Sequence, residues 1–123
     1  MNKTQLTLII CGYSSLLMGG IFFLNPYFYA SLEGANFENI AWLRNLGAAL
    51  ISVNGIGALL AASDPKKEKK LYDVVLLASC LETIALSWST YFWEFSATVQ
   101  GLIIIPLLLA GIISVLLLIF RPK

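Results

Sequence analysis

An acidic residue lies in the middle of a long apolar run, in the stretch VVLLASCLETIALSW of residues 74–88. A carboxyl group in such a setting can hold a proton, donate a hydrogen bond or bind a ligand, because a low dielectric disfavours its charged form. Any chemistry of this chain therefore centres on Glu82. Helical spacing puts Ser79 and Ser89 on the same face as Glu82, and we expect this face to point into the protein.

The residues needed for most enzymatic mechanisms are missing. Histidine is absent, so imidazole ligands for haem or zinc and nucleophiles paired with histidine are excluded. Cys11 and Cys80 lie inside apolar runs without a Cys-x-x-Cys spacing, and we interpret them as buried small hydrophobic residues. One buried acid without a partner base is too little for acid–base catalysis. The sequence predicts a protein that is not an enzyme and carries no cofactor or metal.

The composition is typical of a membrane protein. Of 123 residues, 59% are hydrophobic and 12% are charged, whereas soluble domains are roughly half apolar and about a quarter charged. So short a chain could not hide this much apolar surface, and its length predicts one domain over residues 1–123. The net charge of +1, without a basic stretch interleaved with aromatic residues, indicates no nucleic-acid binding.

Four apolar runs are long enough to cross a bilayer, which requires about 20 helical residues. They cover residues 5–24, 41–62, 71–93 and 97–120. The first run resembles a signal peptide but lacks a small-x-small cleavage site, so we keep it as a span. The sequence predicts an all-α integral membrane four-helix bundle. We expect a short interfacial segment between the first two helices and a tight connection at about residues 94–96.

Positive charge predicts the orientation of this bundle. Lys3 precedes the first span, the lysines of SDPKKEKK separate the second from the third, and Arg121 and Lys123 follow the fourth. The positive-inside rule places this side and both termini in the cytoplasm, in a plasma or inner membrane. The lysine-rich connection could also dock on anionic lipid or on a partner, although topology alone explains it.

Polar side chains of three spans are expected at one depth. Glu82 lies roughly 16 Å from the start of its span at 1.5 Å per residue, and Asn54 reaches a similar depth from the opposite side. Tyr13, with Ser14 and Ser15, lies near this level on the first span. A central acid costs about 2.5–3.5 kcal/mol in a bilayer, so we expect an uncharged Glu82 that faces the interior and pairs within this layer. The layer is either a clamp between helices or a site for a ligand or a proton.

Arg44 is the one basic residue near the other boundary. Its depth differs from that of Glu82 by about 12 Å, so we expect it to extend outward or to pair with Glu94 or Glu38. A stripe of mostly small residues is predicted to pack this span closely against another helix: Arg44, Ala48, Ile51, Gly55, Ala58 and Ala62. Asn54 falls beside this stripe.

Most aromatic residues map to the side opposite the lysines. The predicted outer aromatic surface consists of Tyr27, Tyr29, Trp42, Trp88, Tyr91 and Trp93. Tyr72 and Phe120 are instead expected near the lysine-rich boundary. Aromatic rings anchor proteins at membrane boundaries, but they also line pockets and interaction surfaces, and both interpretations stay open here.

Three stretches of the sequence resemble the small four-helix DoxX-like proteins, including their BphX-like relatives. They are LNPYFYASLEG, then WLRNLGAALISVNGIGALLAASDPKK with an Arg-x-x-Gly formed by Arg44 and Gly47, and a third span with an acid. The resemblance implies a compact four-helix bundle. That superfamily includes accessory subunits of respiratory complexes and assembly factors, and the resemblance supplies no catalytic residues.

Two functions follow as hypotheses. The first is a non-enzymatic accessory or assembly subunit of a larger membrane complex, which binds other subunits or a second copy of the chain through its helix faces and aromatic surface. The second is a binder or carrier of a hydrophobic small molecule such as a quinone, isoprenoid, pigment or lipid, with Glu82, Asn54 and Arg44 as polar contacts; proton-coupled transport is a variant of it. A cavity that reaches Glu82 would favour the second.

Overall fold

The structure, a computed structural model, describes residues 1–32, 40–94 and 103–123. Helix α1 covers Lys3–Leu24 and the short helix α2 covers Pro26–Leu32. Helix α3 (Ala41–Ala49), the π-helical segment η2 (Leu50–Gly57) and α4 (Ala58–Ser63) follow one another without interruption. The last two helices are α5 (Lys69–Tyr91) and α7 (Ile104–Ile119). The described ranges contain helices and no strand, so the all-α prediction is confirmed for them.

Three helices in the described ranges are long and apolar enough to cross a membrane: Lys3–Leu24, Ala41–Ser63 and Lys69–Tyr91. They match the predicted spans 5–24, 41–62 and 71–93 with small shifts at the ends. Helix α7 is apolar but shorter. The first part of the predicted span 97–120 and most of the predicted connection at 94–96 lie outside the described residues. The apolar helices support a location in a membrane.

Local hydrogen bonding determines where the first helices begin and end. Asn2 Oδ1 accepts a hydrogen bond of 2.8 Å from the Gln5 backbone, and the Asn2 N–H donates to Gln5 Oε1 at 3.1 Å, so a capping box begins α1. Asn25 leaves the helical conformation, and Pro26 cannot donate to the hydrogen-bond ladder of α1. The chain therefore turns and starts again as α2, within the segment predicted to lie between the first two spans.

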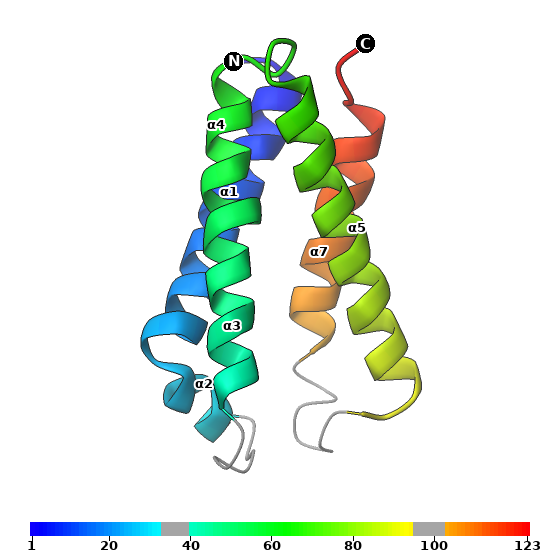
Figure 1. The fold of residues 1–123 in the computed structure, drawn as a ribbon. Coiled ribbons are helices and arrows are strands. Elements are labelled where there is room, and N and C mark those ends of the chain that lie inside the picture. The colour runs from blue at the N-terminus through cyan, green and yellow to red at the C-terminus, as the bar shows by residue number, and fades with distance from the viewer. Residues whose placement is uncertain (33–39, 95–102) are drawn as a thin grey trace.

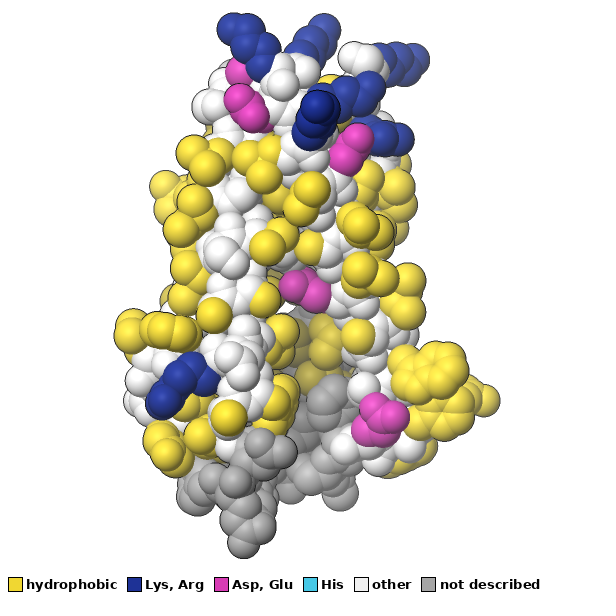
Figure 2. All heavy atoms as spheres, in the orientation of Figure 1, with side chains coloured by type: hydrophobic (Ala, Val, Ile, Leu, Met, Phe, Trp, Pro, Cys, Tyr) yellow, Lys and Arg dark blue, Asp and Glu magenta, His cyan; other side chains and the backbone are white. Residues whose placement is uncertain are grey.

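The helices form two pairs that meet at one end. Helix α1 packs along α3, η2 and α4, and α5 packs along α7, while α5 also contacts η2 and α4 and α1 contacts α7. Figure 1 shows both termini and the α4–α5 connection at the same end, with the two pairs separating towards the end where α2 lies. Lys and Arg side chains gather at the end with the termini (Figure 2). The termini and the lysine-rich connection therefore share one end of the molecule.

The approach of α1 and α3 is too close for side chains at two positions. A Cβ on Gly47 would lie 2.7 Å from the backbone nitrogen of Phe23 and 2.8 Å from the carbonyl oxygen of Gly19. A Cβ on Gly19 would lie 2.9 Å from the carbonyl oxygen of Gly47. Backbone atoms cannot move aside as a flexible side chain can. These two glycines consequently set the distance between the helices.

The buried face of the second long helix differs from the predicted stripe. Leu43, Gly47 and Asn54 are buried, whereas Arg44 and Ala48 are exposed. Leu43, Gly47 and Asn54 fall on one face of the helical repeat, because about one turn separates the first two and about two turns separate Gly47 from Asn54, whereas Arg44 and Ala48 lie one residue off that face. The predicted stripe is therefore wrong for Arg44 and Ala48, and in leaving out Asn54, whereas its members Gly55, Ala58 and Ala62 are buried as predicted.

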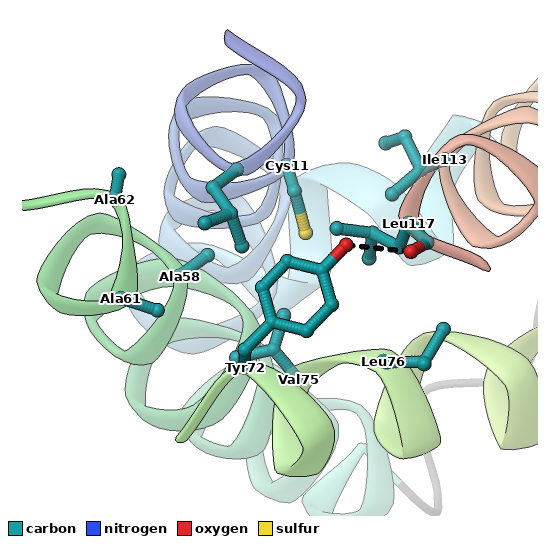
Figure 3. Close-up of a cluster of buried hydrophobic side chains, with 10 residues drawn as sticks. Cys11, Ala58, Ala61, Ala62, Tyr72, Val75, Leu76, Ile113 and Leu117 are labelled. Carbon is teal, nitrogen blue, oxygen red and sulfur yellow. Dashed lines mark hydrogen bonds between the residues drawn. The ribbon is translucent and has the colours of Figure 1, made fainter. Parts of the chain in front are cut away.

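The apolar core lies at the end that holds the termini. Figure 3 shows Tyr72 of α5 among side chains of α1, α4 and α7, and its hydroxyl donates a hydrogen bond of 2.5 Å to the carbonyl of Leu117. The ring is fully buried in a cluster that includes the small side chains of Ala58 and Ala61. Tyr72 thus lies near the lysine-rich end, in the first turn of α5, but its ring is buried in the core because the small residues of α4 leave room for it.

We predict that Gly47→Ala destabilises the protein by about 1–3 kcal/mol, the usual range for overpacking a tight contact. Gly20→Ala is the matched control, because a Cβ at Gly20 meets nothing within 4 Å. The free energy of unfolding of both variants can be measured in mild detergent by titration with a denaturing detergent. Equal stability of the two variants would contradict the close contact between α1 and α3.

Candidate functional site

A cavity of about 240 Å³ lies between the two helix pairs. Residues of α1, α2, α3, η2, α5 and α7 line it, and most of them are apolar. The face drawn in Figure 2 is hollowed between the two pairs of helices, in the half away from the termini. For comparison, an engineered cavity of about 150 Å³ in an apolar core binds benzene. This cavity is therefore large enough for a compact ring system.

The polar groups of the cavity lie beside the core. Asn54 Nδ2 donates a hydrogen bond of 2.9 Å to Glu82 Oε2, which joins η2 of one helix pair to α5 of the other. Asn54 is 2% exposed, while Glu82 is half-buried. Cys11 and Ile113 belong both to the core and to the cavity wall, so the core closes this end of the cavity.

Ser79 belongs to the same polar end. It lies one helical turn before Glu82 on α5 and lines the cavity, as the spacing of the two residues predicts. Its side chain is 2% exposed, and its Oγ has no hydrogen-bond partner among the described residues. Buried hydroxyl groups are normally hydrogen-bonded, so an unsatisfied one in a cavity wall is a position where a ligand group can bind.

The π-helical segment η2 positions the Asn54 amide. Asn54 lies inside η2 and its carbonyl oxygen accepts a hydrogen bond of 3.8 Å from the Cys11 thiol of α1. Gly55, the next residue, packs against Leu16 of α1. The backbone of η2 is thus held against α1 while the amide side chain reaches α5. Short π-helical segments are frequent at functional sites.

The structure brings together Glu82, Asn54 and Ser79 of the predicted site, but not Tyr13. The Tyr13 side chain is 64% exposed on α1 and does not line the cavity. Its neighbours Ser14 and Ser15 line the cavity instead. Tyr13 is one residue away from the inward face, and on a helix one residue changes the direction of a side chain by about a quarter turn.

Arg44 also lies away from the cavity. It is exposed and forms no ion pair with any described residue, so the expected outward position agrees with the structure and the expected pair with Glu94 does not form. Glu94 instead accepts a hydrogen bond of 2.6 Å from the Ser89 hydroxyl. The other expected partner, Glu38, lies outside the described residues. Arg44 therefore contributes no charge to the polar end of the cavity.

The predicted outer aromatic surface divides into two groups. Tyr29 of α2 and Trp42 of α3 line the cavity, together with Phe22 of α1, whose ring meets that of Tyr29 edge to face with centroids 4.5 Å apart. Trp42 is at the same time 52% exposed. The remaining members are exposed and do not line the cavity, namely Tyr27, Trp88, Tyr91 and Trp93. Pocket lining and exposed aromatic surface, which the sequence left as alternatives, are therefore both present.

The sequence predicted the polar part of the wall that α5 contributes, but not its apolar part or the wall that α7 contributes. Ala85 of α5 and Ala110 of α7 line the cavity, as do Ile103 and Pro106 near the start of α7. A signal existed in the sequence, because Ala85 and Ala110 are small residues in otherwise bulky apolar runs. Small side chains on two helices leave space between them where large ones would fill it.

Comparison with known proteins assigns no family to this chain. No protein-family model, curated protein or solved structure matches it. The resemblance to DoxX-like proteins therefore stays a prediction from the sequence. In the described residues no group of three or more His, Cys, Asp or Glu could hold a metal ion. The function must be inferred from the cavity, which has a hydrogen-bonding end and apolar walls.

The hydrogen bond between Asn54 and Glu82 predicts different effects of two substitutions. Glu82→Gln should change the stability little, because a glutamine oxygen can accept the same hydrogen bond from Asn54. Glu82→Leu should destabilise the protein by about 1–3 kcal/mol, because the buried Asn54 amide then loses its acceptor. Unfolding in detergent measures both. A leucine variant as stable as the wild type, beside an unstable glutamine variant, would refute the proposed role of this hydrogen bond.

Proposed function

We propose that this chain is a non-enzymatic integral membrane protein that binds or carries a hydrophobic small molecule in the cavity between its helix pairs. One observation carries the proposal, namely an apolar cavity of about 240 Å³ that ends at the Glu82–Asn54 hydrogen bond. Binding sites for small molecules are typically apolar hollows with a few polar groups at defined positions.

The two parts of the cavity have different roles in this proposal. The apolar walls stabilise the body of the ligand, because removing apolar surface from water contributes about 25 cal/mol per Å². The polar end orients the ligand, because a buried hydrogen-bonding group that stays unpaired is costly. A molecule with one polar group on a hydrophobic body fits this arrangement. Quinones, isoprenoids, pigments and lipids all have this form.

The orientation in the membrane belongs to the same proposal. The lysine-rich end, with both termini, lies in the cytoplasm of a plasma or inner membrane, by the positive-inside rule. Helix α7 then serves as a fourth crossing, since an even number of crossings puts both termini on one side. The core occupies the cytoplasmic half of the bundle and the cavity occupies the outer half. A ligand would consequently enter from the outer half of the membrane or from its outer surface.

The proposal predicts that the purified protein retains a lipophilic molecule. After purification in mild detergent, extraction and mass spectrometry should find one compound enriched at about one per chain. Ala110→Phe should remove it, because the ring would occupy the cavity. Ala49→Phe is the matched control, because Ala49 is exposed and does not line the cavity. The proposal fails if no compound is enriched, or if Ala110→Phe retains as much of it as Ala49→Phe.

A second function, an accessory or assembly subunit of a membrane complex, is supported by a different observation. Trp88, Tyr91 and Phe92 form an exposed cluster at the end of α5, with ring centroids 4.8 Å apart for Trp88 and Phe92 and 5.0 Å for Tyr91 and Phe92. Exposed aromatic residues are enriched where protein partners bind. They are also common at membrane boundaries, so a partner has to be demonstrated.

If the aromatic cluster binds a partner, a stoichiometric protein should co-purify with the wild type from the native membrane. The double substitution Trp88→Ala and Tyr91→Ala should reduce its recovery at least about tenfold, since each of these residues can contribute more than 1.4 kcal/mol at an interface. Leu77→Ala is the control, because Leu77 is exposed on the same helix outside the cluster. Equal recovery with all variants would exclude the cluster as the binding surface.

A further inference from the structure

The acid in the cavity has no basic residue to compensate it. All eight Lys and Arg residues of the chain lie in the described ranges, and none of them lines the cavity. The two ion pairs among the described residues, Lys67–Asp64 and Arg121–Asp73, lie near the termini and the α4–α5 connection. Because an unpaired buried carboxylate is strongly unfavourable, Glu82 holds either a proton or a positively charged group from outside the chain.

Two acceptor atoms at the polar end are available to such a group. Asn54 occupies one carboxyl oxygen of Glu82, and no described residue donates a hydrogen bond to the other. Ser79 Oγ is buried and also lacks a partner among the described residues. Glu82 and Ser79 line the cavity from the same face of α5. A ligand with several N–H donors on one nitrogen could satisfy the carboxylate and the hydroxyl together.

The wall of the cavity also suits a cation. Phe22, Tyr29 and Trp42 line it from α1, α2 and α3. The faces of aromatic rings carry partial negative charge and attract cations, most strongly where water is excluded. An anion, by contrast, would meet an acid and aromatic rings without any base. The described lining therefore disfavours fatty acids and other anionic amphiphiles.

We infer that the ligand of this cavity is a lipophilic cation, a compact hydrophobic body with one amine that is protonated when bound between Glu82 and Ser79. The inference rests on the proposed function and narrows its ligand to one charge class. An uncharged amine that arrives through the bilayer takes the proton held by the Glu82 carboxyl. An ammonium–carboxylate pair then forms in the cavity, and no net charge has to cross the lipid.

Three adamantane derivatives test the charge class, because they share one compact hydrocarbon cage and differ in a single group. They are 1-aminoadamantane, 1-adamantanol and adamantane-1-carboxylate. Binding to the protein in mild detergent can be measured by equilibrium dialysis. The amine should bind at least about tenfold more tightly than the alcohol, as expected for a charge-assisted hydrogen bond, and the carboxylate should bind most weakly.

Variants locate this preference in the cavity. In Glu82→Gln the amine and the alcohol should bind equally, because the charge is gone while the size of the side chain is kept. Ser79→Ala should weaken the amine a few-fold, and Ala110→Phe should abolish binding of all three probes. Ala49→Phe should behave as the wild type. Circular dichroism and size-exclusion chromatography show whether each variant is folded. If Glu82→Gln is not folded, the binding of the three probes to the wild type alone decides the charge class of the ligand.

The outcomes separate this inference from the proposed function. The inference of a cationic ligand is overturned if the amine and the alcohol bind equally to the wild type. It is also overturned if folded Glu82→Gln still prefers the amine. The lipophile cavity survives that result if Ala110→Phe still removes the binding. Absence of binding by all three probes also overturns the inference. The proposed function fails together with the inference only if Ala110→Phe also causes no loss of a native lipophile from the purified protein.

Discussion

The hydrogen bond from Asn54 to Glu82 connects the two helix pairs and constrains how they face each other. An acid at this depth is tolerated only when it faces the interior of a bundle and is hydrogen-bonded, so its presence determines which face of α5 turns away from lipid. That face carries Ser79 as well. Because the amide comes from the other helix pair, a separation of the pairs would leave both side chains unsatisfied. A polar contact thus specifies how apolar helices pack, where apolar contacts alone discriminate little.

The same hydrogen bond lies between two regions that differ in packing. Towards the termini, Ala58, Ala61 and the ring of Tyr72 complement one another in size, and the four packed helices leave a closed core. Towards α2, the pairs separate, and side chains of both pairs line a hollow instead of filling it. A cavity in an otherwise close-packed protein forfeits dispersion contacts along its walls. A ligand that restores those contacts would stabilise the half of the bundle that is least closed.

The sequence was sufficient for features that depend on hydropathy and on the rise of a helix. The first three spans and the common depth of Glu82 and Asn54 follow from these two quantities alone, and the turn of the chain at Pro26 follows from the chemistry of proline. The sequence was insufficient where contacts between helices determine the direction in which a side chain points. The π-helical segment η2, which packs along α1, has no signal in the local sequence pattern, and the burial of Tyr72 depends on small residues of another helix. The cavity is a space between elements, and no local pattern encodes its volume.

The positions of the charged residues bear on both the orientation of the protein in the membrane and the binding of a ligand in the cavity. Bases concentrated at the end with the termini retain that end in the cytoplasm in the proposed topology, and Arg44 extends outward at the other end. No base is left at mid-depth, where it would oppose insertion as strongly as the acid does. Among the described residues, the acid is consequently stabilised by an amide alone, which donates a hydrogen bond but brings no charge. The charge that would complete this site has to come from outside the chain, as a proton or on a ligand, and the two compete for the same carboxyl group.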